Sequence, residues 1–198
     1  MPIYRLDGIT PVIHPTSFVH PSADIIGDVI IGKNVYIGPQ VSIRGDMGKI
    51  HIMDGSNVQD NCVVHGFPNH MTILEENSHI GHGAIIHGCH IKENCLIGMN
   101  AVVMDLSVVG KESIVGAHSF IKANSHFDAR SLILGSPAKV KRLVTDDELT
   151  WKIQGTVMYH ELVERCKNSL IETLPLPFPE ENRGTISFKK MHSVKQTT

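Results

Sequence analysis

Four histidines near the middle of the chain are the residues best suited to do chemistry. His79, His82 and His87 lie in the segment HIGHGAIIHG, and His65 precedes them in NCVVHGF. A neutral imidazole is a common metal ligand and a general base near neutral pH. His82 and His87 are five residues apart, which spans about 16 Å of extended strand at roughly 3.3 Å per residue. They can therefore share one ion only if a corner separates them or if neighbouring subunits build the site together.

The sequence around these histidines repeats every six residues. Aliphatic residues recur at this spacing from Val19 to Ile43 and again from Ile85 to Ile121. A second, usually small residue follows four positions later, at Val29, Val35, Val41, Cys89, Cys95, Ala101, Ser107, Ser113 and Ser119. A period of six fits neither a helix nor simple strand alternation. It predicts short strands with a corner every six residues, so that three sides close a triangular coil of about 18 residues and the coils stack about 4.8 Å apart.

This pattern resembles the hexapeptide-repeat family over residues 10–140. The resemblance implies an all-β fold, a left-handed parallel β-helix, assembled as a homotrimer. The left hand rests on the resemblance alone, because the general rule for parallel crossovers predicts the opposite. We expect the glycines that follow the aliphatic positions, and Asn, Asp or Gly at the corners, to give the backbone the freedom that the turns need.

Two interruptions mark the limits of the repeat. GFPNHMT at 66–72 is predicted to form a loop that protrudes from the coil. Loops on a rigid scaffold often carry functional residues. GSPAK at 135–139 is predicted to end the repeat at Pro137.

A helical period follows from Thr145. TDDE is a capping box, with Thr145 as N-cap and Glu148 three residues later. We predict a C-terminal helical segment over 145–174 that packs on the flank of the β-helix, with a kink or a break into two helices at Gly155. The tail at 175–198 is predicted to be extended or disordered.

An ordered set of motifs resembles the γ-class carbonic anhydrases. The set comprises RGD at 44–46, NVQDN at 57–61, His65, and the pair His82 and His87. In that family three histidines from both sides of a trimer interface hold a zinc or similar ion. The resemblance implies that His65, His82 and His87 are metal ligands and that His82 reaches the metal of the neighbouring chain.

The resemblance also implies roles for the polar residues beside the ligands. Three imidazoles leave zinc with an open position for a water whose pKa falls to about 7, and iron or cobalt would accept the same ligands. Gln59 matches the active-site amide, which would orient the resulting hydroxide. Arg44 would pair across the interface with an aspartate, for which Asp60 is the candidate, while Asp46 and Asn57 match positions near the site. The alternative is an Arg–Asp pair that only fixes trimer packing.

A longer resemblance connects the chain with the PaaY group of phenylacetic acid degradation proteins and the related CaiE group of carnitine operon proteins. It rests on HPSADIIGDVIIG, QDNCVVHGFP, HIGHGAIIHGC, GMNAVVMD, GSPAK, DDELTWK and YHELVERC. QDNCVVHGFP favours the PaaY group, which implies zinc-dependent hydrolysis of acyl-CoA thioesters. Met47 after RGD and a loop without acidic residues provide no carboxylate proton shuttle, which favours this activity over CO2 hydration.

Three alternatives remain open at this point. The first is a γ-type carbonic anhydrase. The second is a hexapeptide acyltransferase, in which GSPAK would line the pantetheine and His118 would be the base. The third is a non-catalytic trimeric accessory protein with a structural metal.

Composition limits the partners. The chain has 18 basic and 20 acidic residues, so a net charge of -2 gives no reason to expect nucleic acid or an anionic membrane as partner. We expect a small-molecule acyl-CoA substrate and a cytoplasmic protein, since neither a signal peptide nor a long apolar run is present. The four cysteines include no CxxC pair and are predicted to be reduced core thiols.

Overall fold

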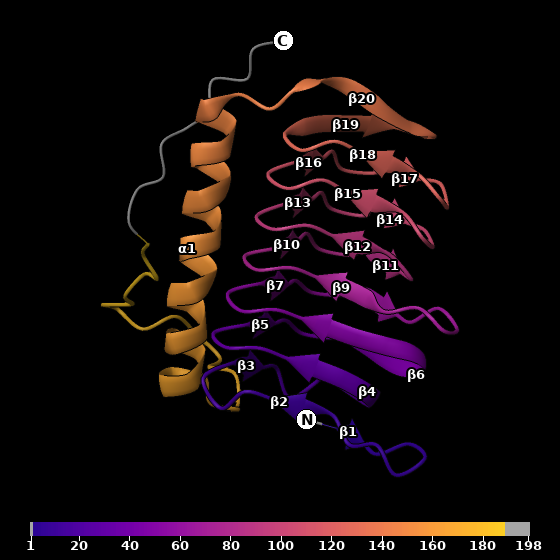
Figure 1. Ribbon diagram of the computed structural model, residues 1–198. Coiled ribbons are helices and arrows are strands. Elements are labelled where there is room, and N and C mark those ends of the chain that lie inside the picture. Colours follow the sequence, from indigo (N-terminus) through magenta and orange to yellow (C-terminus); the bar gives the residue numbers. More distant parts are fainter. Residues whose placement is uncertain (1, 189–198) are drawn as a thin grey trace.

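The computed structural model describes residues 2–188 and shows a parallel β-helix with one long helix along its flank (Figure 1). The coils stack along the chain from the N-terminal end to the hairpin at β19 and β20, as the six-residue repeat predicts. All-β architecture with hexapeptide coils is therefore confirmed. The strands are parallel except where β20 turns back along β19 and closes the stack.

The strands lie on three faces. The first face contains β1 (Ile3–Tyr4), β4 (Asp24–Ile31), β6 (Ser42–Ile52), β8 (Val63–His65), β11 (Ile85–His87), β14 (Val102–Val103) and β17 (Phe120–Ile121). The second contains β2 (Val12–Ile13), the later halves of β4 and β6, β9 (Thr72–Leu74), β12 (His90–Ile91), β15 (Val108–Val109) and β18 (His126–Phe127). The third contains β3 (Phe18–Val19), β5 (Tyr36–Ile37), β7 (Asn57–Val58), β10 (His79–Ile80), β13 (Leu96–Ile97), β16 (Ile114–Val115), β19 (Ser131–Gly135) and β20 (Ala138–Leu143).

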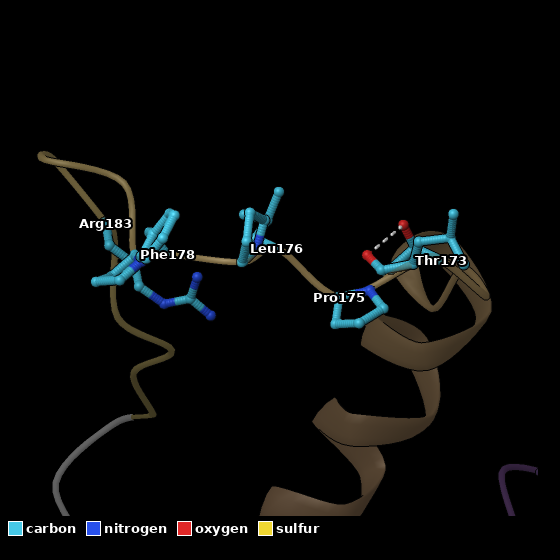
Figure 2. A pocket seen from close by; sticks show the side chains of 8 residues that line it. Thr173, Pro175, Leu176, Phe178 and Arg183 are labelled. Atoms are coloured by element: carbon cyan, nitrogen blue, oxygen red, sulfur yellow. Dashed lines mark hydrogen bonds between the residues drawn. The ribbon is translucent and has the colours of Figure 1, made fainter.

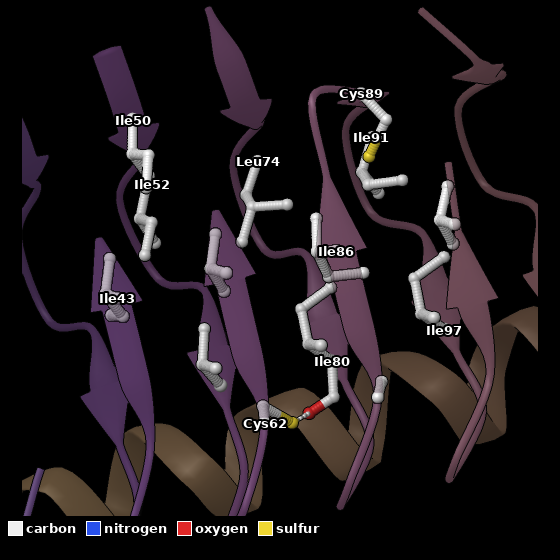
Figure 3. Packing of buried hydrophobic residues seen from close by; sticks show 14 of the residues in the cluster. Ile43, Ile50, Ile52, Cys62, Leu74, Ile80, Ile86, Cys89, Ile91 and Ile97 are labelled. Carbon is white, nitrogen blue, oxygen red and sulfur yellow. Dashed lines mark hydrogen bonds between the residues drawn. The ribbon is translucent and has the colours of Figure 1, made fainter. Parts of the chain in front are cut away.

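A column of aliphatic side chains fills the axis of the β-helix (Figure 3). Most of the predicted aliphatic positions are fully buried there, including Ile43 and Ile97. The prediction for Ile85 is wrong by one residue, because Ile86 is fully buried and Ile85 faces outward with 39% of its surface exposed. The repeat is one residue shorter between Ile86 and Ile91, so the spacing of six does not extend back across HGCH.

The second series of predicted positions is buried as well. Cys89, Cys95 and Ala101 have at most 1% of their surface exposed, and Ser107, Ser113 and Ser119 at most 2%. The four cysteines are free thiols, and three of them belong to this core. Small side chains suit these positions because the chain turns there and little volume remains between coils.

Asparagines, more than glycines, supply the unusual backbone conformations at the corners. Asn94, Asn100 and Asn124 have φ near +55 to +60°, which is the left-handed region that Asn tolerates. The expectation that glycines after the aliphatic positions serve this purpose is wrong. A Cβ on Gly98 would lie 2.5 Å from the backbone nitrogen of Ala117, so glycine is needed there for close approach of the next coil.

The predicted loop leaves the coil after β8. Phe67 and His70 form an isolated antiparallel bridge across its tip, and the chain rejoins the coil at β9. Its base packs closely against β6, because a Cβ on Gly66 would lie 2.3 Å from the backbone oxygen of Gly48. The loop is thus fixed beside His65.

A single helix, α1 (Asp146–Ser169), follows the β-helix. Thr145 is its N-cap and forms the predicted capping box with Glu148. The prediction of a kink or break at Gly155 is wrong. Glycine costs about 1 kcal/mol in a helix interior, and contacts of the buried Lys152 and Thr156 on either side hold the helix intact. Residues 175–188 have no regular secondary structure, and the rest of the predicted tail lies outside the described residues.

Helix α1 is fastened to the third face by polar contacts and by a small apolar cluster. Lys152 Nζ donates to Asn77 O at 2.6 Å and to Asn94 Oδ1 at 2.5 Å. Val163 is buried against Phe18 and Tyr36. Within residues 2–188, no helix is both long enough and apolar enough to cross a membrane.

The buried ammonium of Lys152 makes the docking of α1 depend on pH. Burial lowers the pKa of Lys152 from 10.5 to about 8. The unfolded chain therefore holds this proton more tightly than the folded protein, so the contribution of Lys152 to stability increases between about pH 8 and 10.5. From pH 7 to pH 10, we expect the free energy of unfolding of the wild type to rise relative to that of Lys152→Met by about 2–3 kcal/mol, at 1.36 kcal/mol per pKa unit.

Urea unfolding of both proteins at a series of pH values measures this difference. Lys167→Met is the matched control, because Lys167 is an exposed lysine of the same helix whose Nζ reaches Pro15 O at 2.7 Å. A constant difference between wild type and Lys152→Met across this pH range would contradict the assignment.

Candidate functional site

Three predicted site residues form a column on the first face. Arg44 of β6 pairs with His65 of β8, and His65 pairs with His87 of β11, in consecutive parallel registers. Side chains in equivalent registers of neighbouring strands lie side by side. The coil thus brings together residues that are 21 and 22 positions apart in the sequence. We call Arg44, Asp46, His65, His87 and Asp105 the histidine column.

Hydrogen bonds connect the histidine column from end to end. Asp46 pairs with Arg44 through Oδ2 and accepts from His65 Nε2 through Oδ1 at 2.7 Å. His65 Nδ1 lies 3.0 Å from His87 Nε2, and His87 Nδ1 contacts Asp105. Burial alone would raise the pKa of Asp46, but the hydrogen bond from His65 and the charge of Arg44 together lower it below its usual value. Asp46 is therefore an anion that orients His65.

The two histidines of this column fit a cation between them. With His65 Nε2 and His87 Nδ1 donating to carboxylates, His65 Nδ1 and His87 Nε2 both present lone pairs across 3.0 Å. Facing lone pairs repel unless a proton or a metal ion joins them. Carboxylates on the outer nitrogens are the usual support of metal-binding histidines. Among residues 2–188, no group of three His, Cys, Asp or Glu side chains of one chain could hold a metal, so the predicted ligand set with His82 stays a prediction.

His82 lies apart from the histidine column, at the corner between β10 and β11. Its Nδ1 lies 3.0 Å from Asp60 Oδ2, and 47% of its side chain is exposed. We call His82 and Asp60 the corner pair. Within residues 2–188, neither nitrogen of His82 contacts His65 or His87, and Nε2 makes no hydrogen bond. A carboxylate on one ring nitrogen leaves the other available as a base or ligand.

Gln59 and Asn57 form a third group together with a residue that had no predicted role. Gln59 Nε2 lies 3.0 Å from Asn57 Oδ1 and 2.6 Å from His79 Nε2. The rings of His79 and of Tyr159 in α1 make a T-shaped contact, with 5.2 Å between their centroids. We call Asn57, Gln59 and His79 the amide cluster. It lies on the third face beneath α1.

The amide cluster is buried at a cost. Asn57 and Gln59 have 0% and 3% of their surface exposed. Burial lowers the pKa of His79 to about 3, with smaller contributions from the charges of Lys152 and His82, so the ring is neutral. Asn57 Nδ2 and His79 Nδ1 are buried without a hydrogen-bond partner. Each unsatisfied polar group costs about 1–3 kcal/mol, which is unusual unless function requires it.

The structure adds residues that the sequence motifs did not reveal. Asp105 is 18 residues after His87, one regular coil, and His79 is 20 residues after Gln59. The coil length was therefore a signal that pointed to both partners. Tyr159 carried no such signal, because its position depends on how α1 docks. Arg44 contacts Asp46 of its own chain, and its predicted pairing with Asp60 of another chain stays a prediction.

His118 and the pocket of the C-terminal segment lie outside these three groups of residues. His118 is exposed at a corner with φ of +57° and has no carboxylate partner among the described residues. A pocket lined by Thr173, Leu176, Phe178 and Arg183, among others, is formed by the C-terminal segment alone (Figure 2). Because no histidine or carboxylate lines this pocket, it does not contribute to the chemistry described above.

Two family models match the repeat. Residues 10–45 match a model described as bacterial transferase hexapeptide (six repeats), and residues 71–105 match the hexapeptide repeat of succinyl-transferase. The carnitine operon protein CaiE of Escherichia coli (strain K12 / DH10B) is 54% identical over 183 residues, which covers 92% of this chain and 93% of CaiE.

Solved structures share the fold. A candidate acetyltransferase from Bacillus cereus is 33% identical, with a TM-score of 0.83, over 84% of this chain and 96% of that one. The N-acyltransferase AntD from Bacillus cereus, in complex with dTDP and coenzyme A, is 16% identical with a TM-score of 0.63. The match to AntD covers 80% of this chain and 92% of AntD, and at this identity it shows the fold alone.

These comparisons overturn the principal functional expectation. The sequence predicted a zinc-dependent thioesterase of the PaaY type, but the matching family models describe transferases and the Bacillus cereus structure is a candidate acetyltransferase. The prediction of thioester hydrolysis is therefore wrong. It relied on a set of histidines and motifs that a transferase of the same fold also accommodates, since function depends on the site and not on the fold.

Sequence identity to CaiE extends over nearly the whole chain, including α1, and this shows that the two proteins are related. The repeat, the histidines and the C-terminal helix all fall within the matched 183 residues. The finer assignment to the PaaY group is not confirmed. The chain belongs to the hexapeptide-repeat transferase family, within the group that includes the carnitine operon protein CaiE.

Proposed function

We propose that the protein is an acyltransferase that moves an acyl group from coenzyme A to an amine or hydroxyl acceptor. The transferase relatives support this class of reaction. The observation that carries the proposal is the corner pair, a half-exposed histidine held by a carboxylate on one nitrogen only. Such a pair is the arrangement that general base catalysis requires.

His82 is the histidine of the site with a nitrogen to spare. Both ring nitrogens of His65 and of His87 already face partners in the histidine column. Asp60 Oδ2 lies 3.0 Å from His82 Nδ1, so its negative charge favours the tautomer with the proton on Nδ1 and the lone pair on Nε2. His82 Nε2 would then take the proton of an acceptor that enters from solvent.

The transfer balances without a further reactant. As His82 Nε2 removes the acceptor proton, the acceptor nitrogen or oxygen attacks the thioester carbonyl and a tetrahedral intermediate forms. Its collapse breaks the carbon–sulfur bond, and the leaving thiolate of coenzyme A takes the proton from His82. The acyl group ends on the acceptor, and Asp60 stabilises the imidazolium while it exists.

Gln59 would orient the acceptor. Its amide nitrogen is engaged by Asn57 and His79, which leaves the amide oxygen as the group that can accept a hydrogen bond from the acceptor. Gln59 directly precedes Asp60 in the sequence. Positioning of this kind contributes to catalysis by removing the entropy of alignment.

Replacing His82 tests the base. We expect His82→Asn to lower acceptor-dependent release of coenzyme A by about 10²- to 10⁴-fold, because loss of a general base removes that much of the rate. Thiol release from acetyl-CoA and longer acyl-CoA substrates, assayed with a panel of amine and hydroxyl acceptors, measures the effect. His118→Asn is the matched control, since His118 is an exposed corner histidine without a carboxylate. A His82→Asn variant with wild-type rates would overturn this role.

We also propose that His65 and His87 bind a zinc ion at the interface of a homotrimer, where His82 of a neighbouring subunit would complete the site if it served as a ligand in place of the base. The facing lone pairs of the histidine column support this, together with the ligand pattern that resembles the γ-class carbonic anhydrases. Asp46 and Asp105 would orient the two ligands from outside. A bound zinc would supply a Lewis acid that polarises a carbonyl oxygen. Iron or cobalt fit the same nitrogens.

Metal analysis of the purified protein tests this second proposal. We expect a metal that remains through dialysis in the wild type and is lost in His65→Ala and in His87→Ala, because His65 and His87 are ligands in either role of His82 and the few imidazoles of the site cannot spare one. His90→Ala, which removes a partly buried histidine of the second face, is the control. Full metal content in His65→Ala would contradict the proposal.

His82 cannot serve as base and ligand in the same site, because a nitrogen bound to a metal has no free lone pair. Metal content of His82→Ala distinguishes the two roles. Unchanged metal with lost transfer supports the base, whereas loss of both supports the ligand.

A further inference from the structure

The amide cluster interrupts an otherwise apolar column beneath α1. On the third face the outward positions in successive registers are Phe18, Tyr36, Asn57, His79, Leu96, Ile114 and Leu132. Of these side chains, Asn57 and His79 are the two that keep a buried nitrogen without a hydrogen-bond partner. Leu96 shows that an aliphatic side chain suits the next position in this column. An aliphatic side chain at position 79 would fill the space, but it would leave Gln59 Nε2 without its second acceptor.

We propose that His79 is a positioning residue, which fixes the amide of Gln59 for acyl transfer and connects it through Tyr159 to α1. This inference rests on the proposed function, because it takes Gln59 as the residue that orients the acceptor. It assigns a role to a histidine for which neither the metal motif nor the corner pair has a place.

Two hydrogen bonds fix the orientation of the Gln59 amide. Gln59 Nε2 is an amide nitrogen, so it donates both to Asn57 Oδ1 at 3.0 Å and to His79 Nε2 at 2.6 Å. His79 must then accept at Nε2 and carry its proton on Nδ1. With both amide hydrogens engaged, the amide of Gln59 can no longer flip, and its oxygen keeps one direction.

Helix α1 holds His79 from the other side. Tyr159 meets the His79 ring edge to face, at an interplanar angle of 88°, and also packs against Tyr36 at 5.3 Å between centroids. Aromatic contacts of this geometry restrict ring rotation. The chain of contacts runs from α1 through Tyr159 and His79 to Gln59, so docking of the helix reaches the site.

His79 does not act as an acid or base in this arrangement. Burial keeps its pKa far below neutral, near 3, and the ring is covered by Tyr159. It stays neutral during turnover, and its contribution is an acceptor atom in a fixed place. A side chain with an acceptor at the same reach would serve in its stead, whereas an aliphatic one would not.

Kinetics and stability of two variants test the inference. We expect His79→Leu to lower kcat by between about tenfold and a hundredfold with little change in KM for acyl-CoA, because only the alignment of the acceptor is lost. Its Tm should stay close to that of the wild type, since the unpartnered His79 Nδ1 disappears while the buried Gln59 Nε2 loses one acceptor. His79→Gln, whose amide oxygen can accept from Gln59, should recover most of kcat. His90→Leu is the matched control and should keep wild-type kcat.

Side-chain amide NMR of Gln59, assigned with Gln59→Ala, provides a reading independent of catalysis. The Gln59 amide hydrogens should exchange slowly in the wild type and in His79→Gln, and rapidly in His79→Leu. Unchanged exchange in His79→Leu, or loss of kcat in proportion to a lowered Tm without rescue by His79→Gln, would overturn the inference. If the wild type transfers no acyl group, the proposed function fails, while the amide exchange still decides whether His79 fixes Gln59.

Discussion

Burial of the aliphatic column along the axis stabilises the stacked coils and sets the positions of the side chains on all three faces. Each coil can bury Ile43, Ile80 or Ile97 only by placing it against the equivalent residue of the next coil. This requirement sets the register of every outward side chain as well. Residues about one coil apart in sequence therefore become neighbours, and the histidine column, the corner pair and the amide cluster all arise from this stacking.

Much of the fold could be predicted because each residue type in the repeat has one physical role, either to fill the axis or to allow a turn. Aliphatic and small residues at fixed spacing marked the axis and the turns, and Thr145 with Glu148 marked the start of α1. The errors arose where a local pattern was ambiguous. Ile85 and Ile86 are equally apolar, so only packing shows which is buried, and Gly155 weakens a helix that tertiary contacts nevertheless hold.

The site was harder to predict, because its chemistry also depends on the residues that contact the motif side chains. The motifs identified His65, His82 and His87 but gave no information on Asp105, which supports His87, or on His79, which contacts Gln59. Both are separated from their partners by about one coil, so the predicted coil length was the signal for them, but the motifs alone did not use it. The function inferred from the histidines was wrong, since imidazoles and carboxylates serve a transferase base as well as a hydrolytic metal.

In the proposed reaction the acyl group passes to an acceptor and not to water. Mass spectrometry of reactions containing an acyl-CoA with an isotope-labelled acyl group and a panel of amines and alcohols measures this most directly. We expect the label to appear on an acceptor molecule, with one coenzyme A released per acylated product. Labelled free acid as the sole product, whatever acceptor is added, would contradict it.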